Sequence, residues 1–96
     1  LREDKKRRII GIGRLIIEAD FKNAEFAVVV HDAYQGRGLG HKLIDTLIGI
    51  AQEKELEKIY GIVLTDNDRM LTVCRELGFT TKYLPDGITM VELELK

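Results

Sequence analysis

The sequence is poor in several residue types, and each shortage excludes a class of protein. Its 96 residues include one cysteine, one proline, two histidines and no tryptophan. A single cysteine cannot form an internal disulfide framework, and with two separated histidines it does not supply a zinc site, so we expect no metal. Because proline is rare and 45% of the residues are apolar, the chain does not have the composition of a disordered tail.

Excess charge and long apolar runs are also lacking. Fifteen basic residues stand against 16 acidic ones, a net charge of −1, whereas a general nucleic-acid binder needs a basic surface. No apolar run approaches the ~18 residues that a membrane-spanning helix requires, and the start shows no secretory pattern. We therefore expect a protein of the reducing cytosol, with neither nucleic acid nor membrane as a partner.

The length fits one domain over residues 1–96. The chain starts at Leu1 rather than at a methionine, which suggests a piece of a longer protein. Its first eight residues are mostly charged and predict a solvated turn, with a docking patch as the alternative.

Hydrophobic patterns then predict the elements. Residues 8–17 are apolar on both faces, as in an interior strand, and residues 24–30 form a second strand antiparallel to the first. Residues 38–54 carry an apolar stripe at helical spacing. The remaining elements are a strand at 58–64, a helix at 67–77, and strands at 79–84 and 88–95 joined by a Pro-Asp-Gly turn. The order ββαβαββ indicates an α/β fold, a mixed sheet with helices packed on it.

A glycine-rich loop links the second strand to the first helix. It reads Gln35-Gly36-Arg37-Gly38-Leu39-Gly40. Glycines allow a tight turn and close approach to a ligand, and the N–H groups that begin a helix favour an anion. Arg37 and Lys42 add positive charge there. The alternative is a tight turn without a ligand. A P-loop and a dinucleotide fingerprint both require glycine where this sequence has His41, so the two standard nucleotide loops do not fit.

The spacing of Gln35, Gly38 and Gly40 resembles the signature motif of the GCN5-related N-acetyltransferases (GNAT). A second stretch, from Asn67 through Cys74 to Gly78 and Phe79, is similar to another element of that family. The resemblance covers residues 9–95 and is closest to the acetyltransferase domains of bacterial acyl-CoA synthetase-like proteins, which acetylate protein lysines. It implies a GNAT-like sheet that lacks the opening strand and two helices of the full fold.

The resemblance also implies how acetyl-CoA binds. The backbones of Val28 and Val30 would bond the pantetheine arm, and Asn67 would reach the same arm or the acceptor. The loop N–H groups would hold the pyrophosphate, with His41 either touching phosphate or solvated. The implied cofactor-binding residues are thus Val28, Val30, Gln35, Gly36, Arg37, Gly38, Leu39, Gly40, His41, Lys42 and Asn67.

Two residues are catalytic candidates. An ammonium has no lone pair with which to attack a thioester, so the reaction needs a base. Glu25 is the candidate, because strand alternation places it beside apolar residues whose packing would raise its pKa; the alternative is an ordinary solvated glutamate. Cys74 stands where the family often has a tyrosine acid. It is either a substitute acid or a small buried residue lining the thioester pocket.

The expected function is transfer of an acetyl group from acetyl-CoA to an amine, a protein lysine or a small-molecule amine. Without the opening helices, this chain alone is expected to bind acetyl-CoA but to acetylate slowly or not at all. A non-catalytic acyl-CoA-binding module that regulates an attached enzyme is the alternative. An unpaired sheet edge also predicts a homodimer.

Overall fold

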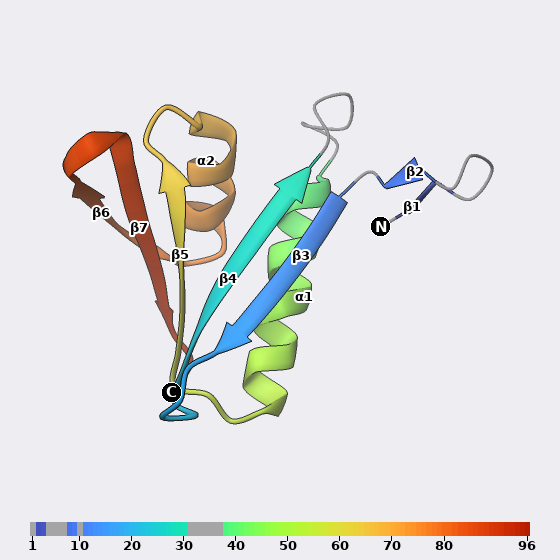
Figure 1. Cartoon of the computed structure of the whole chain (residues 1–96), viewed down its shortest axis with the longest axis vertical. Helices are drawn as coiled ribbons and strands as arrows, with labels where there is room; N and C mark the ends of the chain where they lie inside the picture. The colour runs from blue at the N-terminus through green and yellow to red at the C-terminus, as the bar shows by residue number, and fades with distance from the viewer. Residues whose placement is uncertain (1, 4–7, 10, 31–37) are drawn as a thin grey trace.

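The computed structural model describes residues 2–3, 8–9, 11–30 and 38–96, which form a layer of strands covered on one side by two helices (Figure 1). The main sheet has five strands in the order β3-β4-β5-β7-β6. Its elements are β3 (Gly11–Ile17), β4 (Asn23–Val30), α1 (Leu39–Glu53), β5 (Lys58–Leu64), α2 (Asp68–Glu76), β6 (Thr80–Leu84) and β7 (Ile88–Glu94). The mixed α/β sheet predicted from the sequence is therefore confirmed.

Strands β3 and β4 form an antiparallel hairpin that pairs from Gly11 with Val30 to Ile17 with Ala24. A carboxylate organises its turn. Asp20 Oδ1 accepts hydrogen bonds from the backbone N–H groups of Lys22 at 2.8 Å and Asn23 at 3.3 Å. The hydrogen bond from Lys22 has the largest effect on the pKa of Asp20, and both bonds lower this pKa because they favour the charged form of the carboxylate.

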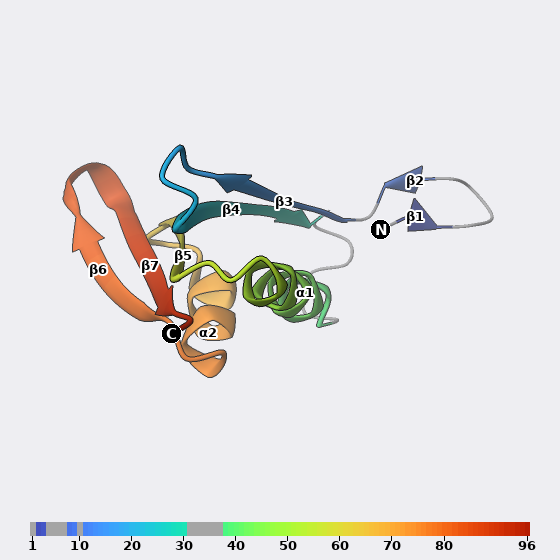
Figure 2. The same ribbon diagram turned by 90° about the horizontal axis from the view of Figure 1, so that it is seen from below.

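Both helices lie on the same side of the strands (Figure 2). Helix α1 packs against β3 and β4 and also contacts α2. Its buried stripe consists of Ile44, Leu47, Ile48 and Ala51, which recur at the three- and four-residue spacing of one helical face. With residues of the strands and α2, this stripe forms the core.

The other half of the sheet is built on β5. It pairs antiparallel with β7 over its whole length, and β7 pairs with β6. The Pro85–Gly87 turn joins β6 to β7 as predicted. Thr89, a fully buried polar residue of β7, shares a hydrogen bond of 2.8 Å with the hydroxyl of Thr65.

The start of the chain differs from the prediction in two ways. The segment expected to be a solvated turn contains a short strand, β1 (Arg2–Glu3), paired antiparallel with β2 (Arg8–Ile9). A run of charges has no apolar alternation by which a strand could be recognised. The following strand, β3, was expected inside the sheet but lies at the edge of its described part. Its apolar character on both faces reflects exposed isoleucines, Ile12 and Ile16, rather than burial on both sides.

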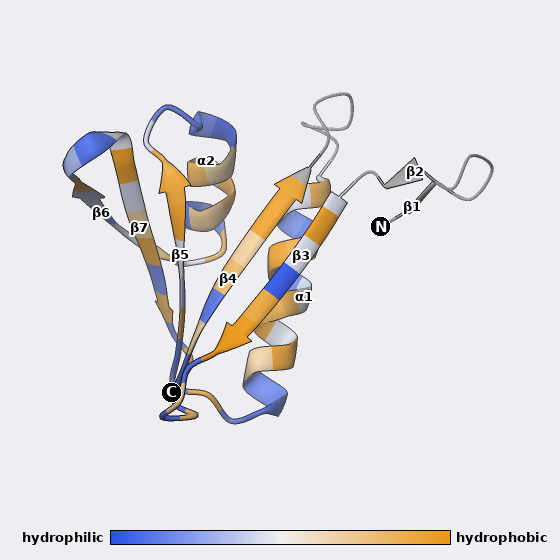
Figure 3. Ribbon diagram, viewed as in Figure 1, coloured by the Kyte–Doolittle hydropathy of each residue, from blue (hydrophilic) through white to orange (hydrophobic). Residues whose placement is uncertain are grey.

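The face of the sheet away from the helices, which we call the open face, carries exposed apolar side chains. They are Ile12 and Ile16 of β3, Val29 of β4, and Ile62 and Leu64 of β5. Hydrophobic residues run along β3, β4 and the upper part of β5 (Figure 3). Toward the start of β4 and β5 the open face becomes polar, where Lys58 forms a salt bridge of 3.1 Å with Glu92.

Candidate functional site

The candidate site is a cleft where two neighbouring strands separate. Strands β4 and β5 run parallel, but they pair at three positions only, the last being Glu25 with Tyr60. Beyond that pair the strands diverge, as Figure 1 shows. From residue 26 to residue 30, therefore, the β5-facing backbone groups of β4 are not used by β5. An extended ligand can take the place of a strand at such an edge.

A cavity of about 190 Å³ lies between the separated strands. The cleft is lined by Phe26, Ala27 and Val28 of β4, by Ile62, Val63 and Leu64 of β5, and by Asn67 and Met70 at the start of α2. Residues whose side chains belong to both faces of the sheet contribute to this lining. Its volume is below the ~300–1,000 Å³ of pockets for drug-sized molecules, which suits a narrow arm of a ligand.

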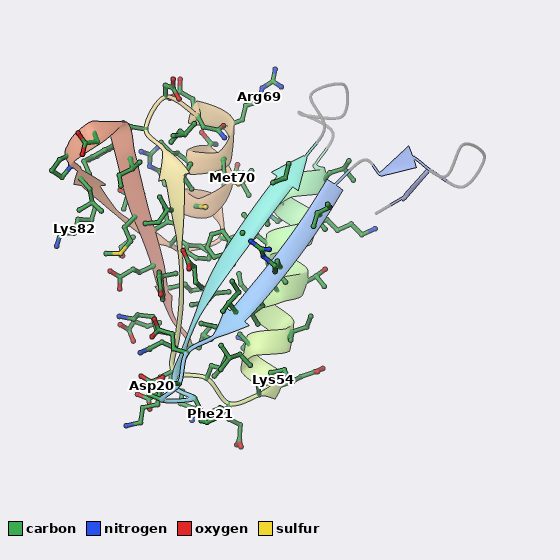
Figure 4. The ribbon with its side chains drawn as sticks, in the orientation of Figure 1. Asp20, Phe21, Lys54, Arg69, Met70 and Lys82 are labelled. Atoms are coloured by element: carbon green, nitrogen blue, oxygen red, sulfur yellow. The ribbon has the colours of Figure 1, made fainter. Side chains whose placement is uncertain are left out.

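The start of α1 lies beside this cleft. Gly38 precedes the helix with φ of +79°, a conformation that side-chain-bearing residues rarely adopt. A Cβ on Gly40 would lie 3.4 Å from Met70 Cε, and Met70 points from α2 toward the space beside β4 (Figure 4). The first turn of α1 contains no acidic side chain, and its N–H groups are suited to bind an anion at this end of the cleft.

Of the residues predicted to bind a cofactor, the structure brings several together. Val28 and Asn67 line the cleft, and Gly38, Leu39, Gly40, His41 and Lys42 form the start of α1, where the His41 and Lys42 side chains are exposed. Val30 ends β4, its backbone paired with Gly11. The predicted loop residues Gln35, Gly36 and Arg37 lie outside the described residues.

Asn67 has a structural role besides lining the cleft. Its side-chain oxygen Oδ1 accepts a hydrogen bond from the Met70 backbone N–H at 3.2 Å, so Asn67 caps α2. The cap fixes the first turn of α2 and, with it, the position of Met70 in the cleft.

Glu25 lies at the closed end of the cleft, in the last pair before the strands separate. It is half-buried. Its cross-strand neighbours are Ile16 on β3 and Tyr60 on β5, so its surroundings are only partly apolar. The Tyr60 hydroxyl donates a hydrogen bond to Glu18 Oε2 at 2.6 Å. Tyr60 thus has a second carboxylate beside it in addition to Glu25, and the alternation of residues along β4 could not predict this.

Cys74 is buried in the core with 0% exposure. Burial raises the pKa of its thiol to about 11, against a smaller opposing effect of Arg75. The thiol therefore stays protonated at neutral pH. Cys74 is a core residue and is not among those lining the cleft.

Three features of the cleft were not predicted: the side chains of Phe26 and Met70 and the position of Gly61. Gly61 sits in the middle of β5, and a Cβ there would lie 2.6 Å from the Phe26 ring. A glycine inside a strand often marks a place where another group approaches the backbone closely. The glycine in the segment KIYGIVL could therefore have indicated such a contact. Which ring approaches Gly61 depends on the pairing of β4 with β5, which the sequence does not specify.

Two properties of the described residues bear on other functions. Among residues 2–3, 8–9, 11–30 and 38–96, no three His, Cys, Asp or Glu side chains are grouped so that they could hold a metal ion. Within the same part of the chain, no helix has the length and apolar character needed to cross a membrane.

Comparisons with known proteins agree with this geometry. Residues 1–79 match the Acetyltransferase (GNAT) family. Acetyltransferase PA5475 of Pseudomonas aeruginosa is 34% identical over 89 residues, which are 93% of this chain and 48% of that protein. The chain belongs to the GNAT family of acetyltransferases. It spans about half the length of this curated relative.

Solved structures show the same fold. The GNAT domain of S. lividans PAT has a TM-score of 0.79 and 30% identity over 93% of this chain and 56% of its own. The structure of yncA, a putative acetyltransferase from Salmonella typhimurium with its cofactor acetyl-CoA, has a TM-score of 0.80 and 25% identity, covering 93% of this chain and 60% of that one.

Proposed function

We propose that this chain forms the acetyl-CoA-binding part of an N-acetyltransferase. One observation carries the proposal: strands β4 and β5 separate after the pair of Glu25 with Tyr60, and the glycine-flanked start of α1 adjoins the resulting cleft through Gly40 and Met70. A narrow cleft with an anion-binding helix end at its side matches a ligand with a slender arm and a pyrophosphate. The related structure of yncA contains acetyl-CoA.

The residues present fit such a ligand. The backbone of β4 around Val28 and Val30 would hold the pantetheine arm, since β5 does not pair with it there. The helix start from Gly38 to Gly40 would hold the pyrophosphate together with Gln35, Gly36 and Arg37, and Lys42 would add positive charge. When bound, acetyl-CoA supplies an acetyl thioester whose carbonyl carbon is open to attack by an amine.

Glu25 is the proposed base. It would take a proton from the acceptor ammonium so that the nitrogen has a lone pair for attack. Its place in the last pair before the strands separate supports this role, because the thioester end of a ligand lying along β4 would come closest to that point. The raised pKa of Cys74 and its burial speak for a core residue and against a thiolate nucleophile.

A protein lysine is the proposed acceptor, with a small-molecule amine as the alternative. The support is the polar end of the open face, where Glu18, Glu25 and Glu92 lie near Tyr60 and Lys58. A cationic acceptor would be attracted to the acidic side of this group.

Calorimetric titration with acetyl-CoA tests the binding proposal, with dephospho-CoA as a comparison. We expect micromolar binding by the wild-type chain. Lys42→Glu should weaken it several-fold, because the new charge repels the ligand's phosphates. Lys54→Glu, at the far end of the same helix, is the matched control and should leave binding unchanged. Absence of heat from acetyl-CoA at millimolar concentration would contradict the proposal.

A non-catalytic module that binds an acyl-CoA and regulates an attached enzyme is the second candidate. The absence of a tyrosine at position 74 favours it. Release of free CoA separates the two candidates: an acetyltransferase releases CoA when an amine is added, and a regulatory module binds acetyl-CoA without turnover.

We also propose that the protein resides in the cytosol and self-associates through a sheet edge. The edge position of β3 in the described sheet and its exposed Ile12 and Ile16 support self-association. Light scattering after size-exclusion chromatography tests it, and a strict monomer across protein concentrations would contradict it.

A further inference from the structure

The closed end of the cleft is formed by an aromatic ring lying over a glycine. Phe26 follows Glu25, so it occupies the first position at which β4 and β5 are no longer paired. In a continued parallel register it would face Gly61. The Phe26 side chain leans across to β5, since a Cβ on Gly61 would lie only 2.6 Å from ring atoms Cε1 and Cζ. The ring thus occupies the space that any side chain at position 61 would need.

The ring is held in this position from behind. Phe26 is 5% exposed, and its ring packs edge-to-face against that of Phe79 with centroids 5.5 Å apart, a favourable aromatic arrangement. Phe79 is itself buried. Because Phe26 packs against both Gly61 of β5 and Phe79, its ring forms a fixed wall of the cleft.

We propose that Phe26, seated over Gly61, ends the acyl pocket and restricts this protein to short acyl groups, acetyl in preference to longer chains. The inference rests on the proposed function, because it assumes that an acyl-CoA lies in the cleft with its thioester toward Glu25. A group longer than acetyl would have to displace a ring that has no free space on its far side.

The test compares the affinities of CoA, acetyl-CoA and butyryl-CoA by calorimetry. We expect the wild-type chain to bind acetyl-CoA more tightly than butyryl-CoA. Phe26→Ala removes the wall, and the two additional methylenes of butyryl-CoA can then be buried, so its affinity relative to acetyl-CoA should rise about tenfold. Phe26→Leu retains more of the core volume and should shift the same ratio in the same direction.

A second pair of variants tests the role of Gly61. Gly61→Ala adds a methyl group that meets the ring, so the ring must move into the cleft; acetyl-CoA should bind about tenfold more weakly, and CoA, which lacks the acyl group, should lose less. Combining Gly61→Ala with Phe26→Leu should restore acetyl-CoA binding. Val91→Ala is the control, because Val91 is fully buried opposite Gly61 on β7 but does not line the cleft. It should leave the butyryl-to-acetyl ratio unchanged.

The outcomes separate this inference from the function on which it rests. If CoA and acetyl-CoA bind but the ratio is the same in the wild type, Phe26→Ala and Phe26→Leu, the inference is wrong and the proposed function stands. If the wild-type chain binds butyryl-CoA as tightly as acetyl-CoA, the inference is also wrong. If it binds no CoA compound, both fail.

Discussion

The Tyr60 hydroxyl donates a hydrogen bond of 2.6 Å to Glu18 Oε2, which links the middle of the sheet to the segment that follows its edge strand. This bond, together with burial and the negative charges of Glu18, Glu25 and Asp20, raises the pKa of Tyr60 to about 12. The ionised phenol is disfavoured because it could no longer donate the bond and would face carboxylates.

Tyr60→Phe should therefore lower the free energy of unfolding at pH 7 by about 1 kcal/mol. Because the folded-state pKa of about 12 exceeds the ordinary value, the contribution is fully present below pH ~10 and is lost as the pH rises toward 12. Urea unfolding of both proteins at pH 7 and between pH 10 and 12 measures this. Tyr83→Phe is the control and should cost less at pH 7, because Tyr83 is 60% exposed and its hydroxyl only accepts an exposed hydrogen bond from Arg75. A Tyr60→Phe difference independent of pH would contradict the assignment.

Glu25→Gln should lower kcat/KM for an amine acceptor by about 100-fold or more, since a positioned base contributes ~10²–10⁴ in rate. Acetyl-CoA affinity should stay close to that of the wild type, because the amide retains the size of the carboxylate. Free CoA release at several pH values gives the rates. Glu76→Gln, an exposed position on α2, is the control. Unchanged kcat/KM across pH 6–9 in Glu25→Gln would rule out the base.

Variants of Asn67 separate its contribution to folding stability from its contribution to acetyl-CoA binding. Asn67→Ala removes the cap on α2 and should lower the free energy of unfolding by about 1 kcal/mol, whereas Asn67→Asp keeps a capping oxygen and should cost only a few tenths. Both changes remove the amide from the cleft, and the added negative charge of aspartate repels an anionic ligand. We expect Asn67→Asp to fold normally and bind acetyl-CoA weakly. Normal binding by both variants would show that the cap is the whole role of Asn67.

Cys74 should be nearly unreactive in the folded protein. Its pKa of about 11 leaves little thiolate at pH 7.5, and burial blocks access. Iodoacetamide should label the native chain at least about 100-fold more slowly than the urea-unfolded chain. Labelling of the native chain as fast as that of a small-molecule thiol would show instead that the Cys74 thiol is accessible and readily ionised, which would contradict its place in the core.

Elements of the fold could be predicted from the sequence where their pattern lies within one short segment. Strand β5 matches the predicted 58–64, and α1 begins and ends within one residue of its prediction, because both have strong periodicity between polar neighbours. The antiparallel β3–β4 pair also followed from the short turn between its strands. The edge position of β3 could not be predicted, since isoleucines at an exposed edge and isoleucines in a buried strand give the same sequence pattern.

The residues of the candidate site also differ in how local their sequence signals are. Asn67 could be located at the start of a predicted helix, because helix starts have a local sequence pattern. The cleft could not be derived from the residues alone, because it depends on where β4 stops pairing with β5, a relationship between segments more than thirty residues apart in the sequence. Phe26 and Gly61 are ordinary strand residues until that register is known.

The short β4–β5 pairing also divides the sheet into two hydrogen-bonded ribbons. The β3–β4 ribbon and the β5–β7–β6 ribbon are each continuously hydrogen-bonded, but three paired positions join them. Because β5 does not pair with β4 beyond those positions, the backbone amides along the cleft side of β4 should exchange with solvent sooner than those inside either ribbon. A ligand that bonds to β4 across the cleft would act as the missing strand and slow this exchange, coupling occupancy of the cleft to the rigidity of the whole sheet.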